Sequence, residues 1–235
     1  MALDSPAYGA LPGTASAERI SAFLRGVYGW MAAGLAITAA TAWIVAGSPA
    51  LVAAVFGNRL LFWVLVIAQL GIVFTLSARV RRLAPGTAAL LFVAYSGLTG
   101  VTLSVILLAF TGESIATTFV VTAGMFGGLA AYGTLTRRSL EGIGQFLFMG
   151  LVGVVLASIV GIFWQNDAFQ FVLSFIGVIV FAGLAAYDAQ RLKAMAAATP
   201  PGAAGSYAVV GALALYLDFV NLFLFLLRFT GNRRE

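Results

Sequence analysis

Residues 207–229 read YAVVGALALYLDFVNLFLFLLRF, and this stretch indicates the fold class. It is apolar along almost its whole length, and an α-helix needs about 20 such residues to cross a hydrocarbon core of about 30 Å. Its one acidic residue, Asp218, stands near the middle. The stretch therefore predicts a transmembrane helix that carries a carboxyl group deep in the bilayer.

Six more apolar stretches of similar length precede this one, and polar or turn-forming residues separate them. Ser114 is predicted to cap the fourth of these helices, because a serine hydroxyl accepts hydrogen bonds from backbone amides at a helix start. We therefore expect an all-α membrane protein with seven transmembrane helices. The spans are expected at about residues 23–47, 60–77, 87–110, 115–134, 144–164, 168–190 and 207–229.

The chain is expected to form one membrane domain, residues 20–230, between two short tails. Residues 1–19 contain prolines and glycines and predict a flexible tail, and residues 231–235 form a basic one. The longest loop is expected at 191–205. Small residues at four-residue spacing predict close contacts between helix backbones. These residues are Gly124 with Gly128, and Gly153 with Ala157 and Gly161.

The composition excludes several classes of function. Of 235 residues, 62% are hydrophobic and only 9% are charged, whereas an ordinary soluble domain has about 25% charged residues. Cysteine and histidine are absent, which excludes disulfides, thiolate nucleophiles, His-based catalysis and the usual zinc sites. We expect no enzyme activity and no cofactor.

Lysines and arginines are distributed unevenly between the two ends of the predicted helices. We interpret the net charge of +5 as membrane topology and not as nucleic-acid binding, because basic loops stay in the cytoplasm. The N-terminus is therefore expected inside, in a bacterial inner membrane. The basic C-terminal tail conflicts with a seventh crossing, so a last segment that re-enters is the alternative. The inside segments hold Arg19, Arg25, Arg79, Arg81, Arg82, Arg137, Arg138, Arg191 and Lys193, and the outside segments hold Arg59, Arg228, Arg233 and Arg234.

Two aspartates fall within the predicted spans. Asp218 lies near the middle of the seventh, with Asn221 on the same helical face. Asp188 lies near the end of the sixth, where the helix dipole disfavours an anion, and Arg191 is a candidate to compensate it. An ionisable group near the bilayer centre costs at least ~2.5–3.5 kcal/mol, so such groups tend to line ion or proton paths. The alternative is an ion pair that only fixes packing.

Together the two aspartates predict a pH sensor without histidine. Two adjacent carboxylates do not both ionise cheaply, so the pair is expected to hold one proton at mildly acid pH and to release it as the pH rises. When ionised, the oxygens of Asp188 and Asp218 suit Ca²⁺, which makes them the candidate metal ligands.

Two further polar residues belong to this hypothesis. Arg79 ends the second span and could form a latch with either aspartate that protonation releases; the alternative is an arginine that extends toward the membrane surface. Gln69 stands in the middle of the second span and is expected to hydrogen-bond within the bundle.

Several segments resemble the Bax inhibitor-1 (transmembrane Bax inhibitor motif) family, in its bacterial members. The most specific are VIVFAGLAAYDAQRLK (178–193) and GALALYLDFVNLFLFLLRF (211–229). The others are FLRGVYGWMAAGLAIT (23–38), GLTGVTLSVI (97–106) and TAGMFGGLAAYGTLTRRSLEGIGQFLFMGLVG (122–153).

The resemblance implies a seven-helix fold in which the last helix is central and two three-helix layers surround it. It also implies a pH-sensitive calcium leak across the membrane. The family's transmembrane aspartate pair, its pH sensor, matches Asp188 and Asp218 here. The family's basic residue after the second helix matches Arg79.

Three other functions stay open at this point. A membrane-embedded regulator would bind other membrane proteins, such as quality-control proteases, without transport. An intramembrane aspartyl protease would also use two aspartates, and Tyr187-Asp188 fits its first motif, but Leu217-Asp218 lacks the Gly-x-Gly-Asp of its second. A proton-coupled carrier is the third. The expected partners are the lipid bilayer, Ca²⁺ and protons, with membrane proteins as further candidates and no nucleic acid.

Overall fold

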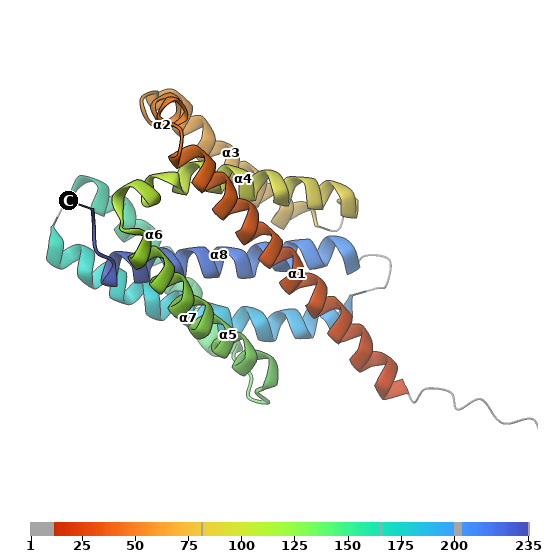
Figure 1. The fold of residues 1–235 in the computed structure, drawn as a ribbon. Helices are drawn as coiled ribbons and strands as arrows, with labels where there is room; N and C mark the ends of the chain where they lie inside the picture. The colour runs from red at the N-terminus through yellow and green to blue at the C-terminus, as the bar shows by residue number, and fades with distance from the viewer. Residues whose placement is uncertain (1–11, 81, 165, 200–203, 235) are drawn as a thin grey trace, which may run out of the picture.

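The computed structural model describes residues 12–80, 82–164, 166–199 and 204–234. The predictions on Arg81, on residues 1–11 of the N-terminal tail and on Glu235 lie outside these residues. The described chain forms eight helices (Figure 1). They are α1 (Pro12–Ala46), α2 (Pro49–Phe56), α3 (Arg59–Arg79), α4 (Pro85–Ala109), α5 (Gly112–Leu135), α6 (Glu141–Phe163), α7 (Asp167–Ala198) and α8 (Ala204–Thr230).

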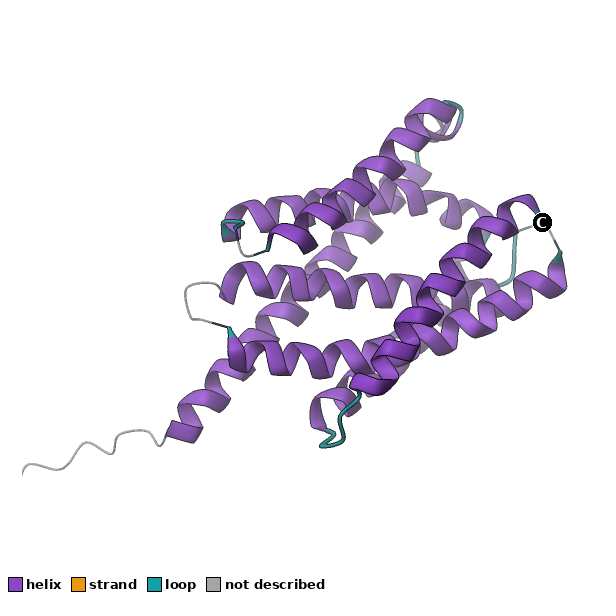
Figure 2. Ribbon diagram, turned by 180° about the vertical axis from the view of Figure 1, so that it is seen from behind, coloured by secondary structure: helices purple, strands orange, loops and turns teal. Residues whose placement is uncertain are grey.

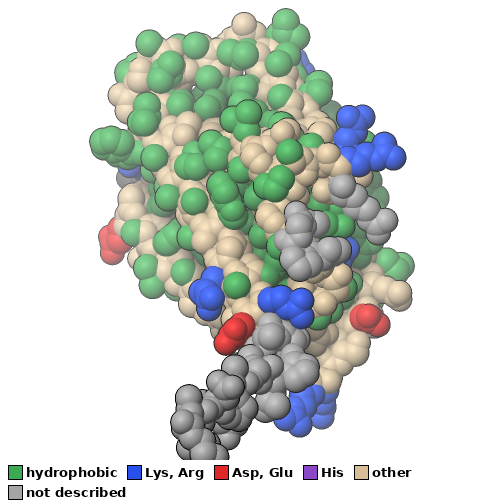
Figure 3. Space-filling view, turned by 90° about the vertical axis from the view of Figure 1, so that its right-hand side faces the viewer, with side chains coloured by type: hydrophobic (Ala, Val, Ile, Leu, Met, Phe, Trp, Pro, Cys, Tyr) green, Lys and Arg blue, Asp and Glu red, His purple; other side chains and the backbone are tan. Residues whose placement is uncertain are grey.

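Every helix except α2 is long and apolar enough to cross a membrane, which gives seven candidate spans. The predicted fold class, an all-α membrane protein with seven transmembrane helices, is confirmed. Short connections join the spans, so successive helices run in opposite directions. Figure 3 faces the end of the bundle at which α1 begins, and several Lys and Arg side chains stand around that face.

Three boundaries differ from those that the sequence predicts. The helix α1 begins at Pro12, within the segment expected to be a flexible tail. The short helix α2 was not predicted and lies between the first two spans. The helix α7 continues to Ala198, so the expected loop at 191–205 is wrong for residues 191–198. Arg191 and Lys193 mark the exit from the bilayer there and not the end of the helix.

Polar side chains start several of the helices by accepting hydrogen bonds from free backbone amides. Asn58 accepts from Leu60 and Leu61 at the start of α3. Thr111 caps α5 by accepting from the Ser114 amide at 3.3 Å. The prediction that Ser114 caps this helix is therefore wrong, because the helix begins one turn earlier.

The last helix, α8, is the most buried of the spans. In its most apolar segment 67% of the residues are buried, against 6% in α3. It packs against α1, α3, α4, α5 and α7 and runs through the middle of the view in Figure 1. The helix α6 packs chiefly on α7 and crosses the bundle obliquely in front when the molecule is seen from behind (Figure 2).

Hydrogen bonds at both ends of α8 place it along the full length of the bundle. At its start, the Ser206 hydroxyl donates to the Leu83 carbonyl at 2.7 Å, next to the beginning of α4. After its end, the Thr111 amide donates to the Asn232 carbonyl at 3.1 Å, next to the end of α4. Because α8 thus spans the same depth as α4, the geometry favours a seventh crossing over a segment that re-enters.

The four-residue spacing indicates one close contact correctly, since a Cβ at Gly161 would lie 2.8 Å from the Gln170 side chain on α7, but it fails at the other glycines. Gly124, Gly128 and Gly153 have open space where a Cβ would stand, so the prediction of tight packing there is wrong. A Cβ at Gly133, in contrast, would overlap the backbone carbonyl of Ala186 on α7. At Gly177 it would lie 2.6 Å from the Phe225 ring on α8. The spacing alone does not tell which face of a helix meets a neighbour.

Candidate functional site

The length of α7 determines the depth of Asp188. The helical segment 189–198 follows this residue, which is about 15 Å of helix at about 1.5 Å per residue. Asp188 is therefore well inside the helix, and the expected cost of an anion at a helix C-terminus does not apply. The extension of α7 also brings Asp188 to the depth of Asp218.

Asp218 lies near the middle of α8 and is only 5% exposed. Its Oδ2 atom is buried and makes no hydrogen bond within the described part of the chain. A buried polar atom without a partner is costly and points to a proton, a water or an ion that completes the site. Asp218 is thus the least satisfied polar group in the core.

The carboxyl groups of Asp188 and Asp218 face each other, close enough for a hydrogen bond when one of them carries a proton. Asp188 is half-buried. The positive charge of Arg191, one turn further along α7, acts on it. The structure therefore brings together the two aspartates that the sequence singled out, together with a cation on the same helix.

The other predicted site residues lie apart from the pair. Arg79 is exposed at the end of α3. In the described part of the chain, the charged groups that act on the aspartates are Arg191 and the aspartates themselves, so the Arg79 latch stays a prediction. Gln69 accepts a hydrogen bond from Thr99 on α4 at 3.3 Å. The Asn221 amide donates to the Leu217 carbonyl within α8 at 2.8 Å.

A buried polar cluster that the sequence did not reveal lies on the opposite side of α8. The Tyr216 side chain is completely buried, and its hydroxyl lies 2.6 Å from Thr38 Oγ1 on α1. Edge-on contacts with Phe92 and Tyr95 of α4 hold the ring. In the sequence, Thr38 and Tyr216 are single polar residues in apolar stretches, and this pattern does not indicate which helices are adjacent.

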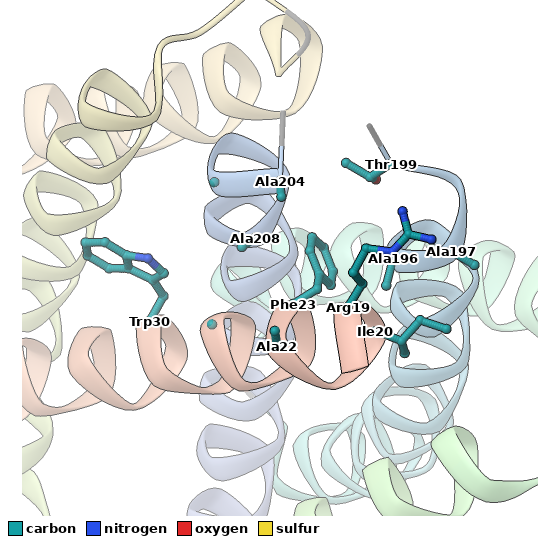
Figure 4. Close-up of a pocket in the computed structure, with 12 residues that line it drawn as sticks. Arg19, Ile20, Ala22, Phe23, Trp30, Ala196, Ala197, Thr199, Ala204 and Ala208 are labelled. Atoms are coloured by element: carbon teal, nitrogen blue, oxygen red, sulfur yellow. The ribbon is translucent and has the colours of Figure 1, made fainter. Parts of the chain in front are cut away.

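One cavity lies at the end of the bundle where α1, α7 and α8 meet, and it has a volume of about 460 Å³. Figure 4 shows that Arg19 extends from α1 toward the end of α7 on one side of it, while Ala204 and Ala208 of α8 line another. Between this cavity and the aspartate pair lie three residues in close contact. A Cβ at Gly211 would lie 2.5 Å from Leu192 and 3.4 Å from Val27.

A second cavity, of about 840 Å³, lies toward the opposite end, between α6, α7 and α8. Asn221 lines it, one turn after Asp218 along α8. The rings of Phe181 and Phe225 stack at 5.7 Å between their centroids, beside the deep end of this cavity. Along α7 and α8, the aspartate pair therefore lies between the residues that line the two cavities and lines neither of them.

The pair offers few ligands to a metal ion. The described residues contain no group of three or more acidic side chains that could hold an ion, whereas a tight calcium site needs six to eight oxygens. Calcium binding by Asp188 and Asp218 therefore stays a prediction.

Comparison with known proteins adds a family to this geometry. The model of the family described as "Inhibitor of apoptosis-promoting Bax1" matches residues 20–235. The inner membrane protein YbhL of Escherichia coli is 49% identical over 218 residues, which cover 92% of this chain and 93% of that protein. An uncharacterized protein of Deinococcus radiodurans is 41% identical over 219 residues, 93% of each chain. The protein YrjE of Lactococcus lactis is 32% identical over 216 residues, 91% of this chain and 92% of YrjE.

Proposed function

The chain belongs to the Bax inhibitor-1 family, and on this premise we propose that it is a pH-sensitive calcium-leak channel. Ca²⁺ moves down its gradient along a path beside α8, and protonation of Asp188 and Asp218 controls that path. The proposal assigns no enzyme activity and no cofactor to the protein, since Ca²⁺ is the transported ion.

The observation that carries the proposal is the placement of Asp218. Its carboxyl group is 5% exposed near the middle of a membrane-spanning helix, faces a second carboxyl group, and has one oxygen without a hydrogen-bond partner. Intramembrane carboxyl groups in such positions tend to belong to ion or proton paths. A pair that only fixed packing would be expected to have all its oxygens satisfied.

The pair supplies the pH dependence. With one proton shared between them, the two groups carry a single negative charge and hold α7 and α8 together by a hydrogen bond. When that proton leaves, two negative charges repel each other in a medium of low dielectric constant. The repulsion favours separation of the helices or entry of a cation, and Ca²⁺ with its water ligands is suited to carboxylate oxygens.

The two cavities support a path through the pair. The first, at the end where α1 begins, is lined by Ala196 of α7 and Ala208 of α8. The second, toward the other end, is lined by Asn221 and Phe225 of α8. Neither Asp188 nor Asp218 lines either cavity, so we take the described state as closed. Opening requires small displacements of α7 relative to α8 and not a new fold.

The chain is a multi-pass membrane protein, and its relative in Escherichia coli is named an inner membrane protein. We place this chain in the inner membrane with its N-terminus in the cytoplasm, because the basic side chains gather at the end where α1 begins (Figure 3) and basic segments stay inside.

The test is calcium flux into liposomes that contain the purified protein, measured at several pH values. The wild-type flux is expected to change with pH. The double variant Asp188→Asn/Asp218→Asn is expected to show little pH dependence, because an amide does not titrate. Glu113→Gln, which removes a carboxylate from the exposed start of α5, outside both cavities, is the matched control and is expected to behave as wild type.

A flux that does not depend on pH, or an unchanged pH dependence in the double variant, would remove the proposal. Absence of flux from a folded wild-type protein would favour a regulator of other membrane proteins. Cleavage of a peptide that depends on both aspartates would favour the aspartyl protease.

A further inference from the structure

Three arginines stand at the end of the protein where the distribution of basic residues does not favour them. Arg228, Arg233 and Arg234 follow the middle of α8, at the end opposite to the start of α1. In the sequence these residues conflicted with a seventh crossing, because basic residues tend to stay inside. Since α8 spans the whole bundle, their presence at this end needs another physical reason.

Two of these arginines line the same cavity, the one of about 840 Å³ between α6, α7 and α8. The guanidinium carbon of Arg228 lies 5.8 Å from the centre of the Phe225 ring, so an aromatic face supports its side chain. Arg233 belongs to the segment that follows α8. It pairs with Phe110 in an antiparallel bridge, and the Arg234 amide donates to the Ala109 carbonyl at 3.0 Å. The backbone bridge therefore fixes Arg233 at the cavity.

The positive charges at this cavity are not balanced by negative ones. The charged group that acts on Arg228 in the described part of the chain is Arg233, which has the same sign. One acidic residue, Asp167, also lines the cavity, so the lining carries a net positive charge. Two arginines held near each other repel, and a phosphate between them would convert this repulsion into charge-assisted hydrogen bonds.

Part of the remaining wall is apolar and belongs to exposed surfaces of α6 and α7, and polar groups of Ser158, Gln170, Ser174 and Asn221 complete it. Val155, Ile159 and Ile162 of α6 and Phe171 of α7 line it, and these side chains are between 49% and 65% exposed. A soluble anion gains no binding energy from these apolar side chains, whereas an acyl chain can pack along them. The site thus joins a cationic end to an apolar trough, which is the chemistry of an amphiphile with an anionic head.

We propose that this cavity binds an anionic phospholipid, whose phosphate group lies between Arg228 and Arg233 and whose acyl chain lies along α6 and α7. The lipid belongs to the leaflet at the C-terminal end of the protein. Clusters of arginine near a membrane surface attract anionic lipids. This is also the cavity that the proposed ion path reaches, but the test below measures lipid retention and not ion flux, so failure of one proposal is distinguishable from failure of the other.

The test uses the full-length protein, purified in mild detergent and mixed with equal amounts of phosphatidylglycerol and phosphatidylcholine. Native mass spectrometry counts the lipids that remain bound. The wild type is expected to retain phosphatidylglycerol preferentially, and Arg228→Gln/Arg233→Gln is expected to bind it more weakly by on the order of tenfold. The control Arg59→Gln/Arg234→Gln removes the same charge from the same end, outside the cavity, and is expected to keep the preference.

Equal retention of both lipids by the wild type, or equal loss in the control variant, would overturn the proposal. A separate arm measures thermal stability in inorganic phosphate. If inorganic phosphate raises the unfolding temperature as much as phosphatidylglycerol does, the site binds a soluble anion, and the proposal of a lipid site is overturned. If the double variant does not fold, Arg233→Gln alone replaces it, because this side chain is exposed.

Discussion

The hydroxyl group of Tyr216 on α8 lies 2.6 Å from Oγ1 of Thr38 on α1. Thr38 Oγ1 also lies 2.9 Å from the carbonyl oxygens of Gly34 and Ser96, which only accept. The two hydroxyl groups are therefore hydrogen-bonded to each other, and either of them can be the donor. Through one threonine, the last helix is tied to α1 and α4 in the middle of the membrane.

This arrangement predicts an order of stability for two variants. Tyr216→Phe removes one hydrogen bond and is expected to cost about 0.6 kcal/mol, the average for side-chain bonds between membrane helices. Thr38→Val removes the bonds to Ser96 and Tyr216 together and leaves a tyrosine hydroxyl buried, so it is expected to cost about 1–3 kcal/mol. Thermal unfolding in detergent measures both.

Thr75→Val serves as the control for these variants, because the Thr75 hydroxyl bonds only the Gly71 carbonyl of its own helix. Its unfolding temperature is expected to stay near that of the wild type. A larger loss for Tyr216→Phe than for Thr38→Val would contradict the role of Thr38 as the link between α1, α4 and α8.

A second prediction concerns the contact between α5 and α7. Gly133→Ala places a methyl group against the backbone carbonyl of Ala186, and backbone yields less easily than a flexible side chain. The variant is expected to lose about 2 kcal/mol or more, as in other overpacked cores. Gly128→Ala, on the same helix with open space around it, is expected to gain up to about 1 kcal/mol from helix propensity. Unfolding of both variants in detergent measures this contrast, and equal effects would contradict the close approach.

The sequence predicted the seven spans because the thickness of the bilayer fixes how long an apolar helix must be. It did not predict where α7 ends, because Arg191 and Lys193 indicate a membrane surface whereas the helix continues through residues 194–198. That continuation decides whether Asp188 reaches Asp218. Helix length outside the membrane is therefore the part of the site that hydropathy does not reveal.

The sequence also did not predict which helices contact each other. The charges at Asp188 and Asp218 were visible because a carboxyl group is rare in an apolar stretch. Thr38 and Tyr216 were not, since both residue types are common in membrane helices and their meeting depends on which helices are adjacent. The four-residue spacing of Gly124 and Gly128 misled for the same reason, because that face of α5 has no neighbouring helix within reach of a Cβ.

The aspartate pair predicts the sign of a pH effect on calcium affinity. Ca²⁺ and protons compete for the oxygens of Asp188 and Asp218, so the calcium concentration at half-maximal flux is expected to fall as the pH rises. If each bound ion displaces one proton, the change is up to about tenfold for each pH unit. The measurement is flux against calcium concentration from mildly acid to mildly alkaline pH. Asp218→Asn is expected to lower the affinity and flatten this dependence, and an affinity that rises with acidity would contradict the competition.

Phe225 separates the cavity between α6, α7 and α8 from the aspartate pair, because its ring stacks on Phe181 and lies on Gly177. Phe225→Leu removes the flat ring but keeps an apolar side chain, so the cost in stability is expected to be only about 1 kcal/mol. If the path runs through this point, the basal calcium leak of the variant is expected to rise several-fold, while Asp218 still sets its pH dependence.

Phe126→Leu is the matched control, since Phe126 is as deeply buried (4% exposed against 6%) but contacts Phe219 on another face of α8. A similar rise in both variants would mean that any loosening of the bundle causes leak, and an unchanged leak in Phe225→Leu would place the path elsewhere. The pattern expected here, a rise at Phe225 alone, requires that ions pass between α7 and α8.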